Sequence, residues 1–184
     1  MQVILASKSP RRLLLLQAAG LAVEVRPAHI DEALLADEDV AMAVQRLAIA
    51  KAAALGSCDT PIIAADTLVA LDGKPLGQPS NIDQARKMLT ALSGSTHQVF
   101  SGVCVVHQGR SVHQSMCTEV CFSPLSDLQI ETYLQHNEVL DKAGAYEIQG
   151  GAASFVRAVN GPLDNVIGLP VRLTLNMLKE VTSP

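Results

Sequence analysis

Tryptophan is absent from this chain of 184 residues, and all aromatic residues together make up only 3% of it. The hydrophobic core must therefore be built from aliphatic side chains, which are plentiful because hydrophobic residues make up 48% of the sequence. A chain of this length suits one domain or two closely joined lobes. We expect a single domain over residues 1–184.

Cysteine is scarce, and its spacing carries no metal or redox pattern. The four cysteines, at positions 58, 104, 117 and 121, form neither a CxxC pair nor a cluster with histidine at zinc spacing. This favours reduced thiols, buried as small apolar side chains, and a cytoplasmic protein.

The chain has no surplus of basic residues, and it has no long apolar run. The chain has 14 Lys and Arg against 18 Asp and Glu, a net charge of −4. We expect no nucleic-acid polymer as partner, although a local basic pocket for a phosphorylated ligand remains compatible. No apolar run reaches the roughly 18 residues of a membrane helix, so we expect no membrane segment and no signal peptide.

The first strand and helix are predicted at the beginning of the chain. Four apolar residues, Val3 to Ala6, predict a short buried strand. Ser9 and Pro10 then predict a helix start, with Ser9 as N-cap and Pro10 at the first helical position. Leucines 13, 14 and 16 form the expected apolar stripe of this helix.

An anion site is expected at this helix start. Ser7, Arg11 and Arg12 lie near the helix N-terminus, where free backbone N–H groups and the helix dipole favour a negative charge. Two guanidinium groups add forked hydrogen bonding that suits phosphate. The alternative is a capped surface helix whose arginines face water.

Two charged residues stand in apolar surroundings further along the chain. Lys51 falls on the apolar stripe of a helix predicted from about Asp39 to Leu55. It either extends to water or points inward to meet an anion. Asp66 lies in the middle of a predicted central strand, 61–71, where a carboxylate needs a cation, a metal, an opening to solvent or a structural ion pair.

Strands and helices alternate in the first half, and a β-rich middle follows. Further strands are expected at 22–26, 98–107, 111–122 and 155–159, and further helices at 80–93, at 126–136 and from about 169. Ser80 and Asp83 resemble a capping box. The glycine-rich stretch 141–151 is either a ligand-binding loop or an ordinary connection. The pattern predicts a mixed-sheet α/β fold.

Several motifs, in this order, resemble the Maf family along nearly the whole chain. They are Ser7-x-Ser9-Pro10-Arg11-Arg12, Asp31-Glu32, Lys51-Ala52, Ala65-Asp66-Thr67, Ser93-Gly94-x-Thr96-His97 and Asp141 to Tyr146. The resemblance implies a nucleoside triphosphate pyrophosphatase that needs a divalent cation (Mg²⁺, Mn²⁺ or Co²⁺). It also implies an elongated α/β fold related to inosine triphosphate pyrophosphatases, with two lobes around a cleft and often a homodimer.

The same resemblance assigns roles to individual residues. Asp66 is expected to be the proton acceptor and, with Glu32, to hold the metal, while Lys51 completes the catalytic set. The expected phosphate-binding residues are Ser7, Arg11, Arg12, Gln78 and Lys142. Arg11, Thr67 and Gln149 match the positions that distinguish the dTTP/UTP subtype from the 7-methyl-GTP subtype. CTP or a modified pyrimidine nucleotide is a further expected substrate.

Gln78 departs from the family pattern, which has lysine before the proline of this loop. Its amide can bind a phosphate oxygen but brings no charge, and Lys74 lies four residues earlier in the same loop. The alternative to an enzyme is therefore a catalytically weak nucleotide-binding regulator linked to septum formation, as bacterial members of the family have been.

Overall fold

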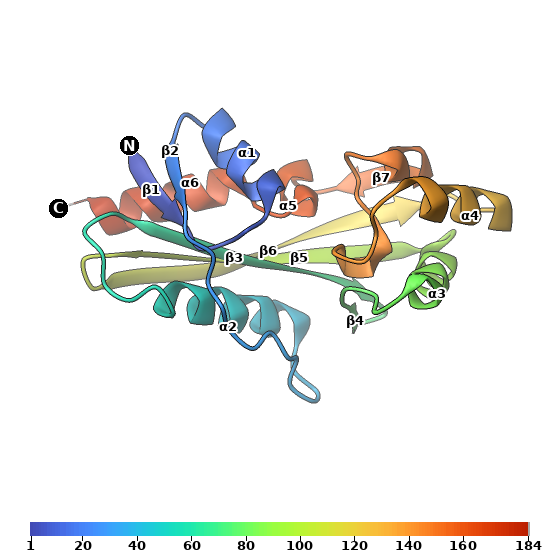
Figure 1. Cartoon of the computed structure of the whole chain (residues 1–184), viewed down its shortest axis with the longest axis horizontal. Coiled ribbons are helices and arrows are strands. Elements are labelled where there is room, and N and C mark those ends of the chain that lie inside the picture. The colour runs from blue at the N-terminus through green and yellow to red at the C-terminus, as the bar shows by residue number, and fades with distance from the viewer. Residues whose placement is uncertain (184) are drawn as a thin grey trace. The chain divides into compact units, whose positions relative to one another are not determined.

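The computed structural model describes residues 1–183 (Figure 1). The strands are β1 Gln2–Leu5, β2 Ala22–Val25, β3 Ile62–Leu71, β4 Lys74–Leu76, β5 Thr96–His107, β6 Arg110–Phe122 and β7 Val156–Asn160. The α-helices are α1 Pro10–Ala18, α2 Val40–Ala53, α3 Ile82–Leu92, α4 Asp127–His136, α5 Leu163–Ile167 and α6 Val171–Thr182. Two 3₁₀ turns, η1 Ala143–Ala145 and η2 Gly151–Phe155, lie in the loop before β7.

The strands form one seven-stranded sheet in the order β2-β1-β3-β5-β6-β7, with β4 beside β3. β1 pairs in parallel with both β2 and β3, whereas β4 is antiparallel to β3 and β7 is antiparallel to β6. The prediction of a mixed-sheet α/β fold is therefore confirmed.

The chain divides into two compact units. Unit 1 consists of Met1–Thr67, Ser101–Met116 and the described chain from Gly168 onward, and unit 2 consists of Leu68–Phe100 and Cys117–Ile167. The expectations of one domain over residues 1–184 and of a cleft between two lobes stay predictions.

Unit 1 has helices on both faces of its strands (Figure 1). Alternate residues of β1 and β3 pack against α1 and α6 on one face and against α2 on the other. Strands covered on both faces are apolar throughout, which explains the uninterrupted run at Val3–Ala6. Helix α2 approaches β5 so closely that a Cβ at Gly102 would lie 2.2 Å from the Val44 carbonyl oxygen.

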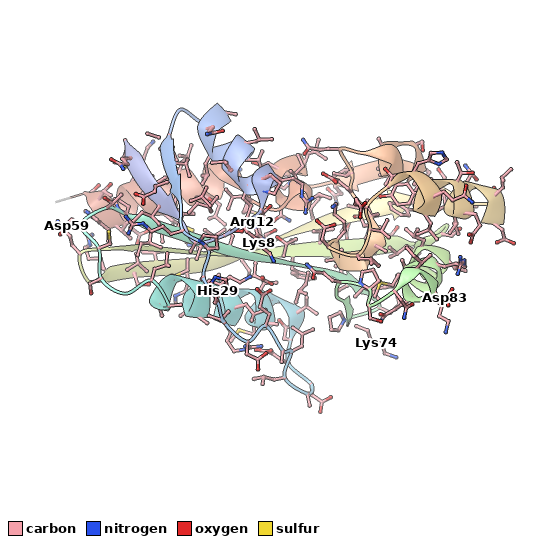
Figure 2. All side chains as sticks on the ribbon, viewed as in Figure 1. Lys8, Arg12, His29, Asp59, Lys74 and Asp83 are labelled. Atoms are coloured by element: carbon pink, nitrogen blue, oxygen red, sulfur yellow. The ribbon has the colours of Figure 1, made fainter. Side chains whose placement is uncertain are left out.

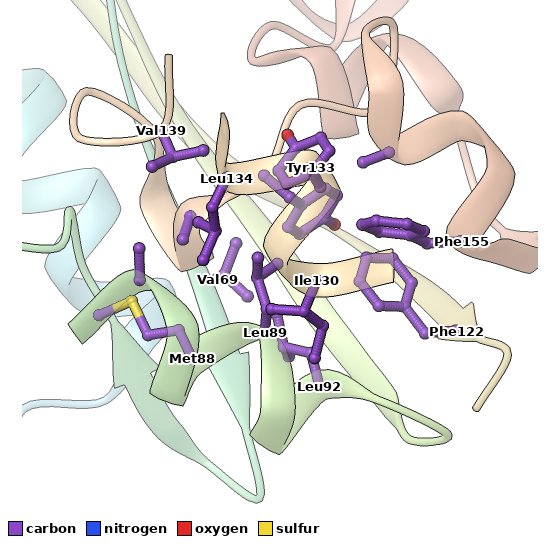
Figure 3. Close-up of a cluster of buried hydrophobic side chains, with 14 of the residues drawn as sticks. Val69, Met88, Leu89, Leu92, Phe122, Ile130, Tyr133, Leu134, Val139 and Phe155 are labelled. Atoms are coloured by element: carbon purple, nitrogen blue, oxygen red, sulfur yellow. The ribbon is translucent and has the colours of Figure 1, made fainter. Parts of the chain in front are cut away.

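Unit 2 has a core of its own, to which the few aromatic side chains of the protein contribute (Figure 3). Helices α3 and α4 supply Leu89, Leu92 and Ile130. The Phe122 ring meets the Phe155 ring edge to face, with centroids 5.9 Å apart. Such contacts add to the burial of apolar surface in the core of unit 2.

Most predicted boundaries hold, and the exceptions have local causes. The Ser9 hydroxyl caps α1, and Ser126 with Gln129 forms a full capping box on α4. The cap of α3 is Asn81 rather than Ser80, because the Asn81 side chain accepts from the Gln84 backbone N–H. Leu14 is 64% exposed and does not belong to the buried stripe.

The sequence patterns missed two short elements, and two of the four thiols are not buried as expected. The three-residue β4 and the five-residue α5 carry too few residues for a detectable period. All four cysteines are free, but Cys117 is exposed and Cys58 is half-buried rather than buried. Within residues 1–183, no helix has the length and apolar character needed to cross a membrane.

Candidate functional site

Arg12 is the central cation of the N-terminal turn in unit 1. Its side chain is buried, which for this residue contradicts the alternative of arginines that face water. Nε donates to the Gly168 carbonyl oxygen at 2.9 Å, Nη1 to Ser7 Oγ at 3.1 Å and Nη2 to Thr67 Oγ1 at 3.1 Å. Within the part of the chain that the structure describes, all hydrogen-bond partners of the Arg12 guanidinium are thus neutral oxygens.

This surrounding leaves a positive charge without a counter-ion at hydrogen-bond distance. Burial lowers the pKa of the Arg12 guanidinium, and the nearby negative charge of Asp66 offsets part of that effect. An arginine side chain nevertheless stays ionised in proteins. A buried guanidinium with only neutral partners favours an anion as its missing ligand. Arg11, one residue earlier, is half-buried.

Lys51 joins the two carboxylates that were expected to hold a metal. From α2, its ammonium nitrogen lies 2.5 Å from Asp66 Oδ1 and 3.1 Å from Glu32 Oε1. The side chains of Lys51 and Asp66 are only 9% and 8% exposed, whereas that of Glu32 is 56% exposed. The inward alternative for Lys51 is therefore correct, and Asp66 has the cation that its place in a central strand requires.

The chemistry of this cluster fits a divalent cation completed by a substrate. Among residues 1–183, no group of three or more His, Cys, Asp and Glu side chains could hold a metal ion by itself. Asp66 and Glu32 offer two carboxylates that both contact one ammonium group. Mg²⁺ is commonly bound by one or two carboxylates together with the phosphates of a substrate, so this donor set is sufficient.

Unit 2 holds a second buried lysine in the glycine-rich loop. The Lys142 ammonium nitrogen lies 2.5 Å from Asp141 Oδ1 and 3.6 Å from Glu147 Oε2. The loop turns at Gly144, where φ is +68° and a Cβ would lie 3.1 Å from the Val69 side chain. Glycine is required there because other residues strain at positive φ.

Gln78 contacts this loop rather than standing free. Its Nε2 donates to the Asp141 carbonyl oxygen at 3.1 Å, and the Gly144 N–H donates to the Gly77 carbonyl oxygen at the same distance. Lys74 lies on β4, exposed, and points outward (Figure 2). Gln149, further along the loop, is exposed.

The structure thus brings Ser7, Arg12 and Thr67 together, and Lys51, Asp66 and Glu32 together, within unit 1. It links Gln78 to the Lys142 loop within unit 2.

Sequence reasoning assigned no role to Ser101 and Gly168, which both contact Thr67. An isolated serine in a strand and a glycine before Leu169-Pro170 carry no local signal, because only the fold brings them to Thr67.

Comparison with known proteins shows several relatives over the whole length of the chain. A family model described as Maf-like protein matches residues 2–181. A protein named dTTP/UTP pyrophosphatase from Anaeromyxobacter dehalogenans (strain 2CP-C) is 44% identical over 187 residues, covering 100% of this chain and 95% of the relative. Another of that name, from Chromobacterium violaceum, is 42% identical and covers 97% of this chain and 94% of its own.

A solved structure extends the comparison to the fold. The structure of a HAM1 protein from Coxiella burnetii has a TM-score of 0.54 with this chain, at 14% sequence identity. The match covers 98% of this chain and 99% of that one. At this level of identity the likeness concerns the fold alone.

Proposed function

The chain belongs to the family of Maf-like proteins, and we propose that it hydrolyses dTTP and UTP to the nucleoside monophosphate and pyrophosphate. The names of relatives that are 42% to 44% identical over nearly the whole chain support this activity. CTP and modified pyrimidine nucleotides are included as further substrates. We also propose that residues 1–184 act as one domain, in the cytoplasm, as a homodimer.

One observation carries the proposal. Arg12 is a buried guanidinium whose hydrogen-bond partners in the described chain are all neutral, and its unit also contains the buried Lys51–Asp66 pair. A polyanion supplies the hydrogen-bonded counter-ion that Arg12 lacks, and Asp66 and Glu32 supply oxygen ligands for a cation that travels with it. A triphosphate with a divalent cation has both properties.

The residues of unit 1 divide the chemistry among them. Ser7, Arg11, Arg12 and Lys51 bind the phosphate oxygens, and Gln78 and Lys142 are proposed as further phosphate-binding residues. When bound by Asp66 and Glu32, a divalent cation (Mg²⁺, Mn²⁺ or Co²⁺) neutralises charge on the triphosphate. Asp66 accepts a proton from water as the water oxygen bonds to the α-phosphorus. The bond from that phosphorus to the bridging oxygen breaks, and pyrophosphate leaves.

Arg11, Thr67 and Gln149 match the three positions that distinguish the dTTP/UTP subtype. A glutamine amide offers both a donor and an acceptor to a pyrimidine edge. No tryptophan exists in the chain to stack on a methylated guanine.

The names of the relatives do not favour the alternative, a regulator with little catalysis that is linked to septum formation. Gln78 is the residue that motivated it. Because Gln78 is exposed and donates to a backbone carbonyl, we infer that it keeps the loop in place and adds little charge stabilisation.

Pyrophosphate release from a nucleotide panel tests the proposal. We expect the purified protein to release pyrophosphate from dTTP and UTP faster than from CTP, GTP and 7-methyl-GTP, with Mg²⁺, Mn²⁺ or Co²⁺ and not with EDTA. Gln78→Lys should raise kcat/KM by up to about fivefold, the effect of one exposed charge pair. Nucleotide-dependent thermal stabilisation without any product would instead support the regulator.

A further inference from the structure

Thr67 occupies a position expected to read the base, yet its hydroxyl is already engaged inside unit 1. Thr67 Oγ1 accepts from Arg12 Nη2 at 3.1 Å, lies 2.9 Å from Ser101 Oγ and donates to the Gly168 carbonyl oxygen at 3.3 Å. A hydroxyl has one proton to donate and two lone pairs to accept with. When Ser101 donates to Thr67, these three hydrogen bonds use the one proton and both lone pairs of the Thr67 hydroxyl.

The proton of Thr67 stays inside the protein in either arrangement. It is donated to Gly168, or to Ser101 if the direction of that hydrogen bond is reversed. Uracil and thymine present two carbonyl oxygens, which need a donor, and one N3–H group, which needs an acceptor. When Ser101 is the donor to Thr67, both lone pairs of the Thr67 hydroxyl are used and none is left for N3–H. Thr67 therefore has no proton for O2 or O4 of these bases unless an internal hydrogen bond breaks.

The same contacts hold the Arg12 guanidinium through both its Nε and its Nη2 atoms. The Gly168 carbonyl oxygen accepts from both Arg12 Nε and Thr67, and Ser101, which is fully buried, supports Thr67 from β5. Gly168 has φ +128°, a conformation that residues with a side chain rarely adopt. Backbone and side chains thus fix the plane of the guanidinium before any ligand arrives.

We propose that Ser101 is a positioning residue of the phosphate site, and that Thr67 acts with it by orienting Arg12 rather than by contacting the base. The inference rests on the proposed function only in taking Arg12 as a phosphate ligand. Loss of either hydroxyl then weakens binding of the triphosphate part of every substrate alike and leaves the choice among bases unchanged.

Inorganic triphosphate with Mg²⁺ separates the two roles because it contains no base. Its Kd, from calorimetry, is compared for the wild type, Thr67→Val, Thr67→Ser and Ser101→Ala. We expect Thr67→Val and Ser101→Ala each to raise the Kd by about tenfold, the effect of one hydrogen bond to a charged group. Thr67→Ser, which keeps the hydroxyl, should raise it less than Thr67→Val does.

Thr174→Val is the matched control for a buried threonine in the same unit. The Thr174 hydroxyl donates to the Pro170 carbonyl oxygen at 2.9 Å, within α6 and without contact to Arg12. This variant should bind triphosphate like the wild type. Thermal unfolding of every variant confirms that it is folded at the temperature of the binding measurement.

The outcomes that overturn the inference are distinct. If Thr67→Val and Ser101→Ala bind triphosphate like the wild type, the contacts are structural only. If Thr67→Val changes the ratio of kcat/KM for UTP and CTP while Ser101→Ala does not, Thr67 reads the base. If the wild type does not bind triphosphate, Arg12 is no phosphate ligand and the inference fails.

Failure of the proposed function has a different signature. A wild type that binds triphosphate but releases no pyrophosphate from any nucleotide is not the proposed enzyme. The comparison of Kd values among the variants still decides the roles of Thr67 and Ser101.

Discussion

Lys51 in unit 1 and Lys142 in unit 2 are both buried, and both contact two carboxylates, but the carboxylates differ. Lys51 meets Asp66, whose side chain is 8% exposed, while Lys142 meets Asp141, whose side chain is 65% exposed. Water solvates Asp141 and screens its interaction with the lysine, whereas Asp66 depends on Lys51. Burial of a lysine alone therefore does not measure its electrostatic importance, because the exposure of its carboxylate partner decides how strongly the pair interacts.

Activity should show the largest difference between the two aspartates. Asp66→Asn removes the proposed proton acceptor and should lower pyrophosphate release from UTP at least about 1000-fold, within the range of general-base catalysis. Asp141→Asn removes only the exposed partner of Lys142 and should lower it less than about tenfold. Steady-state kinetics test this on variants with native circular dichroism spectra. Equal losses of activity in the two variants would contradict the expected difference between the two aspartates.

Stability should separate the two lysines. Lys51→Met leaves Asp66 buried without its closest cation and should lower the free energy of unfolding by about 3 to 5 kcal/mol. Lys142→Met releases carboxylates that water can solvate and should cost less than about 1 kcal/mol. Urea denaturation measures both.

A double variant provides the control for this measurement. Adding Asp66→Val to Lys51→Met removes the stranded charge, so part of the lost stability should return. If Lys51→Met alone costs no more than Lys142→Met, the exposure of the partner does not govern the energy of the pair.

Low pH should lower the stability of the protein through His97, a buried side chain of unit 2 without a charged partner. Its Nε2 lies 2.9 Å from the Tyr146 hydroxyl oxygen, and its Nδ1 has no hydrogen-bond partner among the described residues. Burial lowers the pKa of His97 to about 4, from 6.5. The unfolded chain therefore binds a proton that the native protein resists, and stability falls as the pH drops from about 6.5 to about 4.

The free energy of unfolding should fall by roughly 3 kcal/mol between about pH 6.5 and about pH 4. His97→Gln, compared with the wild type by urea denaturation between pH 7 and pH 5, should show a flatter dependence on pH. The exposed His113, replaced by Gln, is the control and should keep the slope of the wild type. A His97→Gln slope equal to that of the wild type would contradict a neutral buried histidine.

Sequence patterns predicted most of the regular elements, because each depends on neighbours along the chain. The cap at Ser9 and Pro10 gave the start of α1, and the strand around Asp66 was placed within one residue of β3. The cap of α3 was assigned one residue early, since Ser80 and Asn81 are both good N-caps and only the backbone geometry selects Asn81.

The candidate site was predicted in part for the same reason. Motif resemblance indicated Arg12, Lys51 and Asp66 as site residues, and apolar periodicity placed Lys51 on the buried face of α2. Periodicity could not decide whether Lys51 points inward, since the answer depends on Asp66, fifteen residues away on another element. Contacts of Thr67 with Ser101 and Gly168, 34 and 101 residues away, have no sequence signature.

Local sequence patterns were enough to predict the class of the fold, the helix caps that depend on adjacent residues and the set of charged residues that fall in apolar surroundings. Contacts between distant segments settle which of these charges are paired, which carboxylates are shielded from water, and that Arg12 is held by neutral oxygens. The two kinds of property differ in the range of the interactions behind them. Backbone conformation and capping are settled within a few residues, whereas the energy of a buried charge depends on groups that folding brings to it from distant parts of the chain.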